Sequence, residues 1–98
     1  MATRASIVFT WNSEKVIMYH HCDGYYEYLG KLLERYIETY SCDSAIKFCR
    51  ILNELDESFE YTDHIHSDVS YVYYINLENN TIKMYNNKNE LIKDVEVF

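Results

Sequence analysis

The spacing of the apolar side chains changes twice along this chain, and these changes limit the folds that it can adopt. Over residues 5–11 and 15–21, apolar and polar side chains alternate, which predicts two strands joined by a short turn. Over residues 25–40 and 44–55, apolar side chains recur at helical spacing, which predicts two amphipathic helices. The chain is therefore expected to combine a sheet with helices.

The last part of the chain returns to the strand pattern. Residues 69–77 alternate, an asparagine-rich turn follows, and residues 82–85 pair back, with a final strand expected over residues 91–98. Residues 56–68 are acidic, carry histidines and have no clear period, so they are interpreted as a connecting loop. We expect a single α+β domain over residues 1–98. It would have an antiparallel sheet of about four to five strands with two helices packed on one face, in the order ββααββ.

The composition indicates a folded protein in the cytoplasm. Hydrophobic residues make up 48% of the chain and charged residues 26%, which is typical of globular rather than disordered proteins. No apolar run reaches the length of a membrane span, and the first residues lack the apolar core of a signal peptide. Cys22, Cys42 and Cys49 are odd in number and show no CxxC spacing, so no disulfide framework is expected.

The net charge of −7 restricts the class of partner. Proteins that bind nucleic acid directly normally carry a basic patch, so direct nucleic-acid binding is not expected. An acidic surface attracts basic proteins instead, including proteins that themselves handle nucleic acid. The chain contains 11 tyrosines. Tyrosine packs in protein cores and is also enriched at protein interfaces. The sequence therefore favours a protein partner.

Side chains of the kinds that bind metals gather in three segments, residues 20–23, 42–43 and 63–68. The two histidines of the third segment share one side of an extended chain, as a chelating pair requires, and we expect the first and third segments to meet at one end of the sheet. Zinc takes four nitrogen, sulfur or carboxylate ligands. The predicted ligands of a structural zinc are His21, Asp23, His64 and His66, with Cys22 as a replacement. The other interpretation is that these histidines are solvated or bonded to neighbouring aspartates.

The catalytic motifs that can be recognised by spacing are missing from the sequence. It has no glycine-rich phosphate loop, nucleophile elbow or HExxH motif. His21 and Cys22 are adjacent, but neighbours on a strand point to opposite faces, so we do not expect a catalytic dyad. We therefore expect that the protein is not an enzyme. The alternative is a small metal-dependent hydrolase that uses the histidine clusters with Asp23 or Asp63 as the base.

Part of the N-terminal half resembles a family of small phage and prophage proteins. The family pattern reads approximately R-x-x-I, a hairpin, Y-x-H-W-D-G-Y-P and then L-G. The matching segments here are Arg4-Ala-Ser-Ile-Val-Phe, Met18-Tyr-His-His-Cys-Asp-Gly-Tyr and Leu29-Gly30. The residues at family positions are His21, Asp23, Gly24, Tyr25, Leu29 and Gly30, whereas Cys22 stands where the family has tryptophan and Tyr26 where it has proline.

The resemblance implies a mobile-element protein made inside a bacterium. Small acidic phage proteins of this kind often inhibit host defence, and anti-CRISPR proteins are the prominent class. We therefore expect an anti-CRISPR protein that binds a Cas effector nuclease of the Cas9 type and blocks DNA binding or activation without catalysis. Besides the hydrolase, the remaining alternative is a phage accessory protein that oligomerises.

Overall fold

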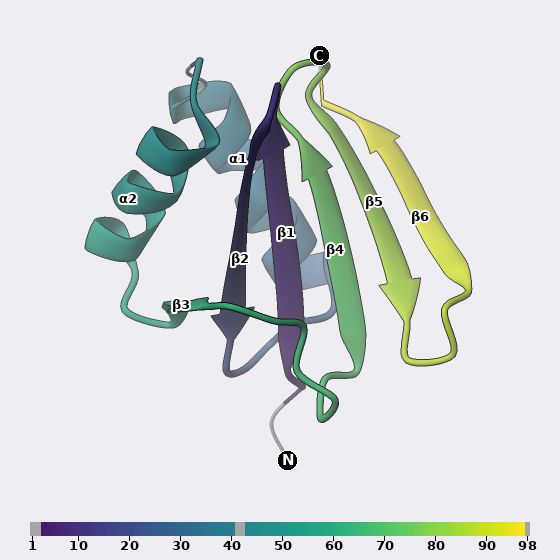
Figure 1. Cartoon of the computed structure of the whole chain (residues 1–98). Helices are drawn as coiled ribbons and strands as arrows, with labels where there is room; N and C mark the ends of the chain where they lie inside the picture. The colour runs from purple at the N-terminus through teal and green to yellow at the C-terminus, as the bar shows by residue number, and fades with distance from the viewer. Residues whose placement is uncertain (1–2, 41–42, 98) are drawn as a thin grey trace.

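A six-stranded mixed sheet with helices on one face forms the fold (Figure 1). The computed structural model describes residues 3–40 and 43–97. The elements in chain order are β1 (Ala5–Trp11), β2 (Glu14–His20), the π-helix η1 (Tyr26–Gly30), α1 (Lys31–Tyr40), α2 (Ala45–Leu55), β3 (Phe59–Thr62), β4 (Tyr71–Asn76), β5 (Thr81–Asn86) and β6 (Leu91–Glu96). No helix within the described ranges is long and apolar enough to cross a membrane.

The α+β class is confirmed, and both helical segments lie where the apolar spacing placed them. The first begins as the π-helix η1 and continues as α1, and the second is α2. Leu29, Leu33 and Ile37 form the buried side of the first segment, each with none of its surface exposed. Phe48 of α2 packs on Phe9 of β1, with ring centroids 5.6 Å apart. These contacts hold the helices against one face of the sheet and bury the apolar stripe of each.

The predicted antiparallel sheet of four to five strands is wrong in two details: the sheet has six strands, and one pair of strands is parallel. The strand order is β3-β2-β1-β4-β5-β6, and the central strands β1 and β4 run parallel, from Ala5 opposite Tyr71 to Thr10 opposite Asn76. After β3 the chain crosses to the free side of β1 and arrives beside the start of β1, where the Ser70 amide donates to the Arg4 carbonyl. It therefore enters β4 in the same direction as β1.

Strand β3 lies inside residues 56–68, which were interpreted as a loop. It has only four residues, and of these only Phe59 is buried. Tyr61 is on the same face but is 53% exposed, because it lies at the edge of the sheet. A strand this short with a single buried side chain has no alternating pattern to recognise.

The connection formed by residues 63–70 crosses the sheet on the face opposite the helices. Figure 1 shows this segment passing in front of β2 and β1 near the start of β1. The amide of His66 donates to Oγ of Ser6 at 3.3 Å, and the amide of Ser70 donates to the carbonyl of Arg4 at 2.9 Å. The connection covers Ser6, which has no exposed surface, so that β1 is buried on both faces along much of its length.

We call the residues at family positions, from His21 to Gly30, the phage-like motif, and its two glycines have structural roles. A Cβ on Gly24 would lie 2.9 Å from the carbonyl oxygen of Thr3, to which the Gly24 amide already donates at 2.8 Å. The Gly24 carbonyl in turn accepts from the buried hydroxyl of Tyr73 at 2.6 Å. A Cβ on Gly30 would lie 2.2 Å from the ring of Tyr26. Both positions require a residue without a side chain because the neighbouring groups are too close.

The start of α2 is held by a carboxylate from the hairpin. Oε1 of Glu14 accepts from the amides of Ala45 at 2.7 Å and Ile46 at 3.3 Å, and from the hydroxyl of Ser44 at 3.0 Å. Ser44 caps the helix by accepting from the amide of Lys47. The Ile46 amide and then the Ser44 hydroxyl lower the pKa of Glu14 below its usual range, because both stabilise the ionised form.

The variant Gly30→Ala is predicted to destabilise the fold by about 1–3 kcal/mol, because the new methyl group forces Tyr26 away from its stack on Tyr73. Urea denaturation followed by circular dichroism measures this loss, with Thr39→Ala at an exposed position of α1 as the control. In a Tyr26→Leu background the same glycine change should cost less. An equal cost in both backgrounds would contradict the proposed clash.

The variant Glu14→Gln is predicted to lower the midpoint of thermal unfolding at pH 7, since the charged acceptor at the start of α2 is lost. The folded-state pKa of Glu14 is depressed, so its contribution is present above the ordinary value of 4.5 and is lost as the pH falls through the folded-state pKa. The difference from the wild type should therefore shrink in acid. Glu38→Gln on the exposed face of α1 serves as the control, and a difference independent of pH would exclude this account.

Candidate functional site

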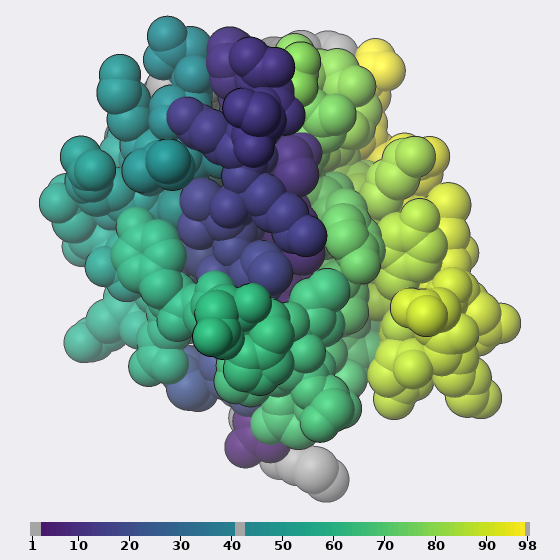
Figure 2. All heavy atoms as spheres, viewed as in Figure 1, coloured from purple at the N-terminus to yellow at the C-terminus, as the bar shows by residue number. Residues whose placement is uncertain are grey.

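A hollow of about 660 Å³ lies on the face of the sheet that the helices leave uncovered. Figure 2 shows this face, with the green atoms of β3 and the following connection lying over the darker atoms of β1 and β2. We call it the histidine hollow. It is lined by Tyr19, His21, Glu60, Tyr61, Thr62, Asp63, His64, His66 and Asp68.

Tyr19 forms the base of the histidine hollow. It is 7% exposed, and the centroid of its ring lies 4.4 Å from that of His66 and 4.8 Å from that of His21. Its hydroxyl donates to Oδ2 of Asp68 at 3.2 Å. Burial, and then the charge of Asp68, raises the pKa of Tyr19. Tyr19 therefore remains a neutral hydrogen-bond donor at physiological pH.

The imidazoles around Tyr19 each bond to a neighbouring side chain. Nε2 of His21 lies 2.9 Å from Oε2 of Glu60. Glu60 is the residue of β3 that lies opposite Tyr19 of β2. Nδ1 of His64 lies 2.6 Å from Oδ1 of Asp63, and this hydrogen bond lowers the pKa of Asp63. Nε2 of His66 lies 3.1 Å from the Thr62 hydroxyl. The rings of His64 and His66 stack at 4.6 Å, so the hollow is lined by aromatic rings with carboxylates at its rim.

The structure brings together three of the four residues predicted to bind zinc. His21, His64 and His66 all line the histidine hollow, whereas Asp23 does not. Cys22 is a free thiol outside the lining, and Cys42 lies outside the described residues. Within residues 3–40 and 43–97, no three His, Cys, Asp or Glu side chains are arranged to hold a metal ion. The zinc site therefore stays a prediction.

His20 lies on the opposite side of β2 from His21, facing the helices. It is 1% exposed and packs edge-on against Phe59, with centroids 4.7 Å apart. Its Nδ1 lies 2.6 Å from the carbonyl of Cys22, which can only accept, so Nδ1 carries the proton. Its buried Nε2 has no hydrogen-bond partner in the described part of the chain. Burial lowers the pKa of His20, which therefore favours the neutral form.

Sequence reasoning missed Tyr19, Glu60, Tyr61 and Thr62 as parts of this site. Glu60 and Tyr61 belong to the strand that was interpreted as a loop, and their position beside β2 depends on its register. The alternation over residues 15–21 does place Tyr19 and His21 on one face, and this was the available signal.

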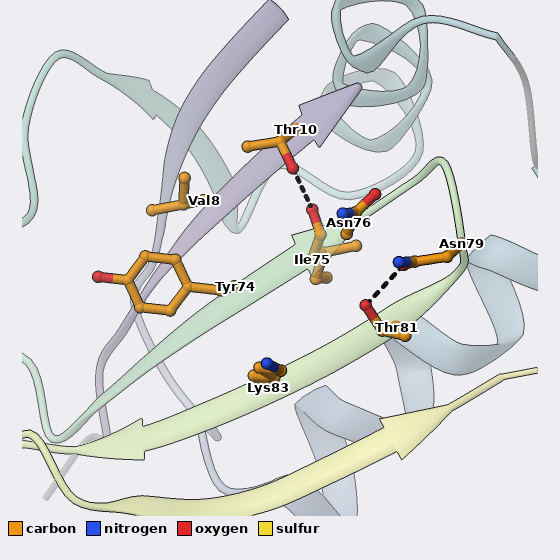
Figure 3. A pocket seen from close by; sticks show the side chains of 8 residues that line it. All are labelled: Val8, Thr10, Tyr74, Ile75, Asn76, Asn79, Thr81 and Lys83. Carbon is orange, nitrogen blue, oxygen red and sulfur yellow. Dashed lines mark hydrogen bonds between the residues drawn. The ribbon is translucent and has the colours of Figure 1, made fainter. Parts of the chain in front are cut away.

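A second hollow of about 350 Å³ lies on the same face across β1, β4 and β5 (Figure 3). We call it the central hollow; its lining is Val8, Thr10, Tyr74, Ile75, Asn76, Asn79, Thr81 and Lys83. Tyr74 is 41% exposed and meets the ring of Tyr85 edge-on at 5.5 Å. The Thr81 hydroxyl donates to Oδ1 of Asn79 at 2.8 Å. This part of the open face therefore offers aromatic and apolar surface with a polar rim.

No family model, curated protein or solved structure matches this chain. The resemblance to small phage proteins therefore stays a prediction.

The zinc prediction requires about one zinc ion per chain in tag-free protein, measured by inductively coupled plasma mass spectrometry. The double variant His64→Ala, His66→Ala should lose the metal. Asp23→Asn should retain it, because Asp23 lies outside the histidine hollow. Protein without metal, or metal that persists in the double variant, would show that these histidines do not form the site.

Proposed function

We propose that the protein is an inhibitor that binds a basic surface of another protein, and that its target is a host CRISPR effector nuclease, with a Cas9-type enzyme as the first candidate. It would block DNA binding or activation by occupying the surface that meets nucleic acid, without catalysing a reaction. The resemblance to small phage proteins supports this setting, and the distribution of charge supports the mode of binding.

The observation that carries the proposal is the concentration of negative charge in one stretch of chain. Residues 51–70 contain six acidic residues and no lysine or arginine, whereas the rest of the chain contains ten acidic and nine basic residues. One stretch therefore accounts for nearly all of the net charge of −7. We call these side chains the acidic edge; they are Glu54, Asp56, Glu57, Glu60, Asp63 and Asp68.

The fold displays the acidic edge along one side of the sheet. The stretch comprises the end of α2, the edge strand β3 and the whole connection across the open face. Exposed apolar side chains lie among the charges: Tyr61 is 53% exposed, Leu55 51% and Ile65 41%. Exposed aromatic and aliphatic anchors surrounded by charged groups are typical of protein interfaces.

An acidic surface of this kind suits a partner whose own surface is basic because it binds nucleic acid. Complementary charge accelerates association and selects against wrong partners. The carboxylates would occupy the positions of phosphates, and Tyr61 would supply contact area. The histidine hollow lies within the same surface, so a partner side chain could enter it.

The triple variant Glu54→Gln, Glu57→Gln, Glu60→Gln is predicted to raise the concentration needed for half-inhibition of target DNA cleavage by about tenfold or more, because it removes complementary charge from the interface. The matched control is Glu27→Gln, Glu38→Gln, Glu90→Gln, which changes the net charge equally at sites elsewhere on the surface. Inhibition of purified Cas effectors is measured at two salt concentrations, and higher salt should weaken the wild type.

Two results would contradict the proposal. If the two triple variants lose inhibitory potency equally, overall charge rather than the acidic edge determines inhibition. If the wild-type protein neither binds nor inhibits any effector in a panel that begins with Cas9-type enzymes, the CRISPR target itself is wrong.

A further inference from the structure

The two edges of the sheet differ in whether another strand can join them. At the β3 edge, the amide of Phe59 donates to the carbonyl of Asp56 at 3.1 Å, and its carbonyl accepts from Nδ2 of Asn53 at 2.8 Å. The end of α2 thus satisfies outward-facing groups of a strand that is already short. At the other edge, β6 pairs only with β5, and within the described residues no element lies beyond it (Figure 1).

The register shows which main-chain groups of β6 face outward. The amide of Val97 donates to the carbonyl of Asn80 at 2.9 Å, so these opposite residues form a hydrogen-bonded pair. In an antiparallel ladder, hydrogen-bonded pairs alternate with pairs whose groups point away from each other. The amides and carbonyls of Asp94 and Glu96 therefore point away from β5, to the open side.

The side chains of these two residues lie on the open face of the sheet. Asp94 is opposite Lys83 and Glu96 is opposite Thr81, and both of these β5 residues line the central hollow. Asp94 and Glu96 are exposed. At the beginning of β6, Leu91 is 49% exposed and Ile92 is 44% exposed. The free edge thus combines unpaired main-chain groups, two carboxylates on one face and apolar side chains at one end.

A second copy of this chain does not fit the edge well in an antiparallel arrangement. Three registers would pair the outward-facing residues Asp94 and Glu96 of the two copies. They place Asp94 opposite Asp94, Asp94 opposite Glu96, or Glu96 opposite Glu96. Like charges directly opposite each other destabilise a strand pair. The charges on β6 therefore act against self-pairing and favour a strand that carries positive charge.

We propose that β6 is a second binding surface, which takes up an extended basic segment of a partner protein as a seventh strand. The segment carries lysine or arginine at two positions that are separated by a single residue, and these positions lie opposite Asp94 and Glu96. Its main chain bonds to the outward amides and carbonyls of those residues, and its intervening side chain lies beside Val95. This surface is at the opposite edge of the sheet from the acidic edge, so the two proposals can fail separately.

The test uses the full chain and two synthetic peptides, Thr-Lys-Val-Lys-Val-Thr and its counterpart with glutamate in place of lysine, both blocked at their ends. Amide hydrogen exchange and chemical shifts are followed by nuclear magnetic resonance. We expect the lysine peptide to slow exchange at the amides of Asp94 and Glu96. It should bind about tenfold more tightly than the glutamate peptide, since two cross-strand ion pairs are replaced by repulsion.

The charge-swapped variant Asp94→Lys, Glu96→Lys should reverse this preference, and circular dichroism checks that it is folded. This variant should inhibit a target that binds the acidic edge as strongly as the wild-type protein does. Unchanged exchange at both amides with the lysine peptide would overturn the proposal. Equal binding of the two peptides, or protection of these amides by self-association in the absence of peptide, would also overturn it.

Discussion

The burial of β1 on both of its faces is the constraint on which the other features of this fold depend. One face of β1 packs on the helices through Ile7 and Phe9, and Ser6 on the other face lies under the connection after β3. A strand buried in this way belongs in the middle of a sheet and needs a neighbour on each side. The hairpin supplies β2, and β4 has to supply the other neighbour. The pair is parallel because the connection after β3 ends beside the start of β1, where the Ser70 amide donates to the Arg4 carbonyl.

The histidine hollow is a consequence of this topology. The chain leaves β3 at one edge and enters β4 on the far side of β1, so residues 63–70 must cross the open face. The crossing brings His64 and His66 onto the surface of β2, where Tyr19 and His21 already point outward. The crossing also carries Asp63 and Asp68, which continue the negative charge of the end of α2 and of β3 onto the open face. The proposed binding surface therefore includes part of the segment that closes the fold.

The parts of this structure that could be predicted from sequence are those encoded by local spacing. Leu29, Leu33 and Ile37 mark a helix because their spacing alone places them on one face. The meeting of the histidine segments could be expected because strand ends gather at the ends of a sheet. Strand β3 could not be predicted, since Phe59 is its only buried residue. Nor could the position of Asp23, whose φ of 52° places it in a left-handed turn and whose side chain bonds to Tyr25.

Most residues of the phage-like motif lie outside the proposed binding surface, although His21 lines the histidine hollow, and this bears on what the resemblance can mean. Gly24 and Gly30 are required where backbone and ring approach too closely for a side chain, and Asp23 adopts a turn conformation that few residue types tolerate. A motif of such residues specifies how the first hairpin joins the first helix. The charges that would select a partner lie in residues 51–70, and Glu60 meets the motif through Nε2 of His21 at 2.9 Å. Proteins that share the motif would therefore share this junction, while the target of each would depend on the rest of its surface.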